Sequence, residues 1–189
     1  RVGHLIDAIT PFGEWSPHQA LWIVAMDYEA GHRVVFGRDD APPAPLADAV
    51  MASCAIPGWF EPVSIDSRTY VDGGAWSATS ADVLTGQGLD EVYVVAPMVS
   101  FETDEPDSLL SRLERRWRGS VTRRCASEVE ELRETGATVT VLGPGREDLE
   151  AMGGNIMDGR RRLEVLETSL RTSRVALEHG GSGRLADTG

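Results

Sequence analysis

Tyr70-Val71-Asp72-Gly73-Gly74 places an aspartate at the end of a β-branched run, with two glycines directly after it. An Asp-Gly pair is typical of a tight turn, because the short side chain bonds nearby backbone and glycine adopts conformations closed to other residues. The stretch therefore predicts a carboxylate held on a turn, with space beside Gly73 and Gly74 for a substrate or a facing turn. A plain strand-end turn is the alternative interpretation of these residues taken alone.

A second informative segment, Ala52 to Pro62, combines the end of a small-residue helix, a proline-glycine stop and two aromatic residues. Apolar clefts suit fatty substrates, so Pro57, Gly58, Trp59 and Phe60 are candidate lining residues of a substrate pocket. Packing of the aromatic rings in the core is the alternative. The segment also holds Ser53 and Cys54, which are nucleophilic residue types. Their place at a helix end, without a strand-to-helix elbow, favours packing over catalysis.

Together the two segments resemble the second half of the patatin-like phospholipases, a family of acyl hydrolases. The resemblance implies an α/β fold, a patatin-like three-layer sandwich of which this chain is the C-terminal portion. It also implies a Ser-Asp dyad in which Asp72 accepts the proton of a serine, with Gly73 and Gly74 as its motif turn. The similarity extends over residues 22–36, 49–62, 69–81, 89–97 and 138–170.

The nucleophile motif of that family, Gly-x-Ser-x-Gly, does not occur in the 189 residues. Its nearest counterpart, residues 180–184, has Arg184 in place of the second glycine. The chain begins with Arg1, so we expect a fragment or a processed product whose serine lies upstream or on a partner fragment. Such a fragment is expected to be inactive alone. The rival hypothesis is a non-catalytic lipid-binding or interaction domain that kept the fold without the nucleophile.

Composition excludes several other classes of function. A net charge of -12 disfavours nucleic acid as a partner. All 18 basic residues are arginine, which excludes a lysine Schiff base or a P-loop lysine. Cys54 and Cys125 are too few for a disulfide framework or a zinc site and are predicted to be buried thiols. No metal or organic cofactor is expected. The four histidines fall in predicted loops, turns or termini and suggest no catalytic triad: His4, His18, His32 and His179.

The order of hydrophobic patterns indicates an α/β chain. Hairpins are predicted over residues 21–36 and 62–71, the second of which delivers Asp72. Further predicted strands cover 92–96, a run of the kind buried on both faces of a parallel sheet, and 138–142. Helices are predicted over 46–55, 78–84, 107–134, 147–152 and 158–178, with Asp158 as an N-cap. Residues 1–178 are expected to form part of a single domain, and 179–189 a flexible tail.

Two arginine clusters raise the question of membrane contact. One lies at positions 112, 115, 116, 118, 123 and 124, and the other is Arg160-Arg161-Arg162. A solvated helix face is the usual meaning of such runs, and docking to lipid phosphate is the alternative. The longest apolar run, Val92 to Val99, is far shorter than the ~20 residues that cross a bilayer. A lipid or acyl-ester substrate, peripheral membrane contact and a cytoplasmic location are the corresponding expectations.

Overall fold

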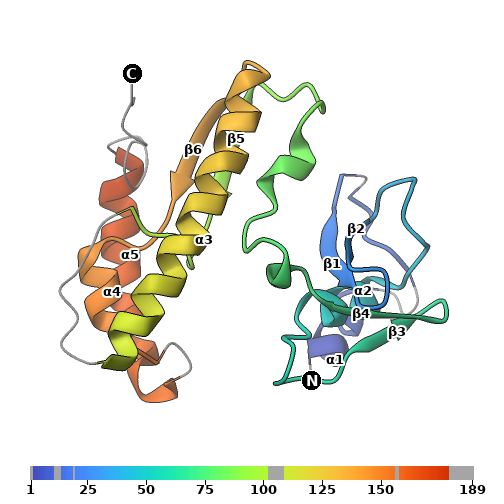
Figure 1. Ribbon diagram of the computed structural model, residues 1–189, viewed down its shortest axis with the longest axis horizontal. Helices are drawn as coiled ribbons and strands as arrows, with labels where there is room; N and C mark the ends of the chain where they lie inside the picture. The colour runs from blue at the N-terminus through green and yellow to red at the C-terminus, as the bar shows by residue number, and fades with distance from the viewer. Residues whose placement is uncertain (1, 11–13, 19, 102–108, 156–157, 179–189) are drawn as a thin grey trace. The chain divides into compact units, whose positions relative to one another are not determined.

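The computed structural model describes residues 2–10, 14–18, 20–101, 109–155 and 158–178 (Figure 1). These residues fall into two compact units, Arg1–Ser80 and Ala81–Gly189, each with its own sheet. The mixed content of helices and strands confirms the predicted α/β class. A single patatin-like domain over 1–178 stays a prediction, and the predicted tail at 179–189 lies outside the described residues.

The first unit is built on a four-stranded antiparallel sheet with the order β2-β1-β4-β3. Both predicted hairpins are confirmed. The turn of the second hairpin holds Asp66 and Ser67 at φ 47° and 62°, as a two-residue type I′ turn requires. The strands are β1 (Ile23–Asp27), β2 (His32–Phe36), β3 (Val63–Ile65) and β4 (Arg68–Asp72).

Helix α2 (Leu46–Ser53) packs against β1, β4 and β3, and α1 (Val2–Asp7) packs against α2. The face of α2 toward the sheet carries alanines, so the helix backbone comes close to the strands. Phe36 and Tyr70 meet edge to face, with their ring centroids 5.1 Å apart. The buried core of this unit is Ala25, Phe36, Ala49, Ala52, Ile65 and Tyr70.

A buried carboxylate joins the two hairpins. Asp27 is the last residue of β1 and is almost completely buried. Its Oδ1 accepts a hydrogen bond of 2.8 Å from Ala30 N, and its Oδ2 accepts one of 2.8 Å from Arg68 Nη1. These bonds, that from Ala30 first, lower the pKa of Asp27 below its usual value. The ionised side chain therefore ties the turn of the first hairpin to the start of β4.

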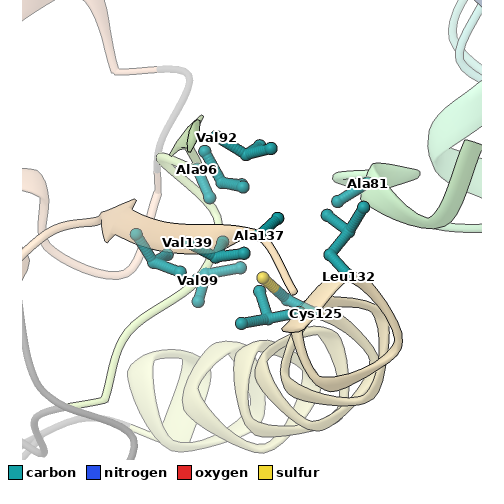
Figure 2. Close-up of a cluster of buried hydrophobic side chains, with 11 residues drawn as sticks. Ala81, Val92, Ala96, Val99, Cys125, Leu132, Ala137 and Val139 are labelled. Carbon is teal, nitrogen blue, oxygen red and sulfur yellow. The ribbon is translucent and has the colours of Figure 1, made fainter. Parts of the chain in front are cut away.

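The second unit is a β-α-β arrangement. Its parallel strands β5 (Glu91–Val95) and β6 (Thr138–Leu142) are joined by the long helix α3 (Leu109–Glu134). Figure 2 shows Val92 and Val139 from the strands pointing toward Cys125 and Leu132 of the helix, which are part of one buried cluster. The predicted long helix is confirmed from residue 109, whereas its first predicted residues, 107 and 108, lie outside the described residues.

The remaining helices of this unit follow β6 or precede β5. Helix α4 (Arg146–Met152) packs against α5 (Arg162–Glu178). The predicted cap is confirmed, because the Asp158 side chain accepts a hydrogen bond from Arg160 N. Three short 3-10 helices complete the chain: η1 (Gly73–Ala75), η2 (Ala81–Leu84) and η3 (Gly159–Arg161). The predicted helix at 78–84 is thus only the single turn η2.

Strand β5 differs from the prediction that both of its faces are buried. Val92 and Val94 are buried toward α3, but Tyr93 and Val95 on the other face are exposed. An unbroken apolar run does not reveal which face a helix covers, since that depends on elements far along the chain. Of the helices in the described ranges, none is long and apolar enough to span a bilayer. The cytoplasmic location stays a prediction.

We predict that Asp27 stabilises the first unit in a pH-dependent way. Because its pKa is lower in the folded than in the unfolded chain, the ionised form favours folding above the unfolded value of ~3.9. This contribution is lost as the pH falls through the folded pKa. Asp27→Asn should lower the free energy of unfolding at neutral pH and flatten its fall in acid. Urea unfolding followed by tryptophan fluorescence between neutral pH and pH ~3 measures both effects.

The control is Asp66→Asn, the same change at an exposed carboxylate of the same unit. Asparagine also tolerates the positive φ of that position. This variant should keep the wild-type acid dependence. Identical acid dependence of Asp27→Asn and the wild type would contradict the role given to Asp27.

Candidate functional site

Asp72 is the last residue of β4 and is held there by its backbone. Asp72 pairs with Ala25 in the central strand β1. Its N–H donates a 3.0 Å hydrogen bond to the carbonyl of Ala55, just beyond the end of α2. The prediction that the second hairpin delivers Asp72 to a strand end is confirmed. The backbone of Asp72 is therefore held by both a strand and a helix end, and this fixes the position of its carboxylate.

The side chain of Asp72 is half-buried and oriented by one hydrogen bond. Its Oδ1 accepts a 2.7 Å bond from Gly74 N, which makes Asp72 the N-cap of η1. Among the described residues, Asp72 makes no ion pair, and its Oδ2 accepts no hydrogen bond. One oxygen thus fixes the orientation of the group, and the other is open to a proton donor.

The structure requires glycine at positions 73 and 74 for lack of space, and not for the special backbone conformation that the sequence suggests. Neither has a positive φ, so left-handed backbone is not what requires glycine here. A Cβ on Gly73 would lie 2.6 Å from the carbonyl oxygen of Val24 on β1, closer than real Cβ atoms come. A Cβ on Gly74 would lie 3.0 Å from Asp72 Oδ1. The glycines allow the turn to press against β1 and to bond the carboxylate.

Cys54 precedes Ala55, whose carbonyl binds Asp72 N, and is not the buried thiol that the sequence predicts. It caps the C-terminal end of α2 and is exposed, whereas Cys125 is buried as predicted. Partial burial and, second, the negative charge of Asp72 raise the pKa of the Cys54 thiol. A protonated thiol is a weak nucleophile. Cys54 is therefore poorly suited to replace the serine, in line with the interpretation from sequence.

The candidate pocket residues Pro57, Gly58, Trp59 and Phe60 form an exposed turn that begins just after Ala55. The N–H groups of Trp59 and Phe60 both donate to the carbonyl of Ile56 at 3.0 Å. Trp59 is 63% exposed and Phe60 56%, so the alternative of core packing is wrong for both. Their role in a substrate pocket stays a prediction.

One hollow in the first unit has a volume of about 340 Å³ and lies elsewhere on its surface. Neither Asp72 nor the turn at Trp59 contributes to it. Its lining includes Trp15, Gly37, Arg38 and Pro43. This hollow therefore gives no support to an acyl pocket at Asp72.

Trp76 was not singled out from the sequence, although it follows the two glycines closely. The residue is 47% exposed, and the guanidinium of Arg33 lies 6.0 Å from the centroid of its ring. An aromatic residue directly after an Asp-Gly-Gly turn is a signal that sequence reading could have used. Trp76 adds an exposed apolar side chain just after η1.

The arginine cluster on α3 is not a uniformly solvated face. Arg118 is buried and donates to Glu114 at 2.7 Å and to the Pro97 carbonyl at 2.8 Å. Arg124 pairs at 3.0 Å with the buried Glu128, whose second oxygen accepts from Ala81 N. Arg118 thus holds α3 to the segment after β5, and Arg124 pairs with the glutamate that binds Ala81 N, so both guanidinium groups are engaged within the unit.

The second cluster is also engaged in local structure. Arg160 pairs with Asp158 at 2.8 Å and thereby contributes to lowering the pKa of that carboxyl to about 2. Arg161 Nη1 donates to the carbonyls of Glu150 and Ala151 at the end of α4. All three arginines nevertheless remain exposed, so this cluster is also a solvated face, as predicted.

The described residues show neither a histidine-based site nor a metal-binding group. His4, His18 and His32 are exposed, as predicted, and His179 lies outside the described residues. Across the described ranges, no group of three or more His, Cys, Asp or Glu side chains could hold a metal ion. Asp72 is therefore the titratable group on which the candidate site is built.

Comparison with known protein families supports the resemblance seen in the sequence. Residues 20–85 match the family model described as patatin-like phospholipase. The match spans β1, β2, α2, β3, β4, η1 and η2, and so includes Asp72 and the exposed turn at Trp59. The suspected family resemblance is confirmed over this segment. Beyond residue 85 it stays a prediction.

We predict that Gly73→Ala destabilises the first unit by about 1–3 kcal/mol, because the added methyl must push the turn away from the Val24 carbonyl. Urea unfolding followed by tryptophan fluorescence measures the loss, since four of the five tryptophans lie in this unit. Gly119→Ala within α3 meets no atom closer than 3.8 Å and should stabilise its helix by about 0.5–1 kcal/mol. A neutral Gly73→Ala would show that the close approach is not a constraint.

We also predict that Asp72→Asn speeds alkylation of Cys54 at mildly alkaline pH. Removing the negative charge lowers the thiol pKa and so raises the thiolate fraction. Iodoacetamide labelling followed by peptide mass spectrometry measures the rate at each pH. The buried Cys125 is the internal control and should stay slow in both proteins. An unchanged or slower rate at Cys54 would mean that the two side chains are not neighbours.

Proposed function

We propose that this chain, patatin-like over residues 20–85, contributes the base of a Ser-Asp dyad in a lipid acyl hydrolase. Asp72 is the base, and the serine comes from a segment outside the 189 residues, either upstream or on a partner fragment. The observation that carries the proposal is the state of the Asp72 carboxylate. One oxygen is fixed by Gly74 N at 2.7 Å, and the other has no described partner.

The proposed reaction is acyl transfer through the serine. The serine hydroxyl oxygen attacks the ester carbonyl carbon, and Asp72 Oδ2 accepts the proton that this hydroxyl loses. The alcohol leaves with that proton, and water then hydrolyses the acyl-enzyme with Asp72 again as base. Oxyanion stabilisation must come from donors outside the 189 residues, since no glycine-rich oxyanion loop occurs here.

Exposed apolar side chains near Asp72 support an acyl-chain substrate. Ile56, Trp59 and Phe60 follow Ala55, whose carbonyl binds Asp72 N, and all three are exposed. Large apolar side chains in water are costly unless they meet a partner, and aromatic rings suit the boundary between lipid and water. We propose that this turn contacts the acyl chain or the surface of the lipid that carries it.

A non-catalytic lipid-binding or interaction domain is the second candidate. One specific observation favours it, namely that Gly-x-Ser-x-Gly does not occur in these residues. The exposed turn at Trp59 would then bind lipid without turnover. The two candidates differ in one measurable property, which is whether Asp72 affects the reactivity of a serine.

We predict that Asp72→Asn lowers ester hydrolysis by about 10² to 10⁴-fold in the protein that joins this chain to its Gly-x-Ser-x-Gly segment, because the serine loses its base. Hydrolysis of a chromogenic short-chain ester measures the rate. Labelling by a fluorophosphonate probe reports on the serine directly and should fall in parallel. The 189-residue chain alone should show neither reaction.

Asp66→Asn is the matched control, an identical change in the same hairpin at an exposed turn position. It should leave both activity and labelling at wild-type levels. Undiminished hydrolysis by Asp72→Asn would remove Asp72 from the mechanism. A coding sequence without any Gly-x-Ser-x-Gly segment would favour the non-catalytic candidate.

A further inference from the structure

Helix α5 packs against its own unit with a face of small and polar side chains. Val165, Thr168, Thr172 and Ala176 are half-buried. Thr172 Oγ1 donates a 2.8 Å hydrogen bond to Asp148 Oδ1 on α4. Arg171 forms an ion pair with Glu147, which is also on α4. None of the residues of α5 is fully buried. Its attachment therefore uses little apolar surface.

The four leucines of α5 lie on another face. Leu163, Leu166, Leu170 and Leu177 are 65%, 53%, 65% and 54% exposed. At about 100° per residue, these four fall within an arc of roughly 60°, which we call the leucine stripe. The arc is centred about 145° from the half-buried face. A continuous apolar stripe of this kind is typical of a helix that packs against a second helix.

Charges beside the leucine stripe are divided along the helix. On one flank, Glu167 precedes Leu170 and Arg174 follows it. Neither has a described ion-pair partner. The other flank carries Arg162 at the start of the helix, followed by Ser169 and Ser173, which are small enough for a neighbouring helix to approach closely. On the first flank an acidic residue thus precedes Leu170 and a basic residue follows it, with Glu178 at the last position of the helix.

We propose that the leucine stripe binds α5 of a second copy of this chain, antiparallel, with a two-fold axis at Leu170. This arrangement sets Leu163 against Leu177 of the second copy and Leu170 against its own counterpart. Glu167 then faces Arg174 of the second copy, and the symmetry makes this pair twice. A parallel pair would instead set the charged flank against the serine flank and leave the charges unmatched.

The same features disfavour a lipid surface as the occupant. Helices that lie on membranes carry basic residues beside the apolar face and aromatic residues within it. The leucine stripe has an acidic and a basic residue on its flank and no aromatic residue. A protein surface with the opposite order of charge fits it, and a second α5 has that order by symmetry.

The expected association is weak. A helix of 17 residues is about 25 Å long and offers fewer than three heptads, so the contact lies at the small end of specific interfaces. We expect a dimer with a dissociation constant on the order of micromolar or weaker. Sedimentation velocity of the full 189-residue chain over a wide concentration range measures it.

Variants test both the role of the leucine stripe in association and the antiparallel arrangement of the two helices. Leu170→Gln should give a monomer with unchanged helical circular dichroism, because the residue is exposed. Glu167→Arg places arginine on both sides of Leu170 and Arg174→Glu places glutamate on both sides, so each alone should weaken association at least tenfold. An equimolar mixture of these two variants should associate as a heterodimer. Arg116→Glu, an exposed reversal on α3, is the matched control and should associate like the wild type.

Three results would overturn the proposal. The first is a wild-type chain that stays monomeric at all concentrations, which would mean that something other than a second copy covers the stripe. The second is a dimer that survives Leu170→Gln. The third is a mixture of Glu167→Arg and Arg174→Glu that fails to associate. Binding of the chain to phosphatidylcholine and phosphatidylglycerol vesicles, lost in Leu170→Gln without any self-association, would assign the stripe to lipid instead.

Discussion

The hydrogen bond from Asp72 N to the Ala55 carbonyl joins the end of β4 to the end of α2, and the geometry of the candidate site follows from it. The bond brings together two segments that are distant in sequence. It joins the strand end that carries Asp72 to the segment that carries Cys54 and the exposed turn at Trp59, while Gly73 presses against Val24 on β1. A side chain at Gly73 would separate these elements. The orientation of Asp72 is therefore a property of the backbone of the first unit.

Both units bury charged side chains, and in each case the charge connects elements that hydrophobic packing alone would leave free to shift. Asp27 holds the first hairpin to Arg68 at the start of the second. Glu128 accepts from Ala81 N and holds η2 against α3, while Arg118 holds α3 to the segment after β5. Every one of these groups has a hydrogen-bond partner, which offsets its loss of solvation.

The apolar residues outside the two cores are as informative as those within. Exposed rings at Trp59 and Phe60 follow the residue that binds Asp72, and exposed leucines line one face of α5. The first group follows Ala55, whose carbonyl binds the N–H of the proposed base, so we propose an acyl chain as its partner. The second has matched charges on its flank, so a helix with the same pattern is a better one. Neighbouring charge distinguishes the two surfaces, although both are hydrophobic.

The sequence by itself determined the hairpins, the long helix α3 and the place of Asp72 at a strand end, because these depend on periodicity and turn residues that act over a few neighbours. The match over residues 20–85 agrees with the resemblance that the Asp-Gly-Gly turn suggested. Only the tertiary structure decided that Gly73 is needed for its contact with Val24, that Arg118 is buried and that one face of β5 is exposed. Each of these depends on atoms brought together from distant parts of the chain, and local pattern carries no information about such contacts.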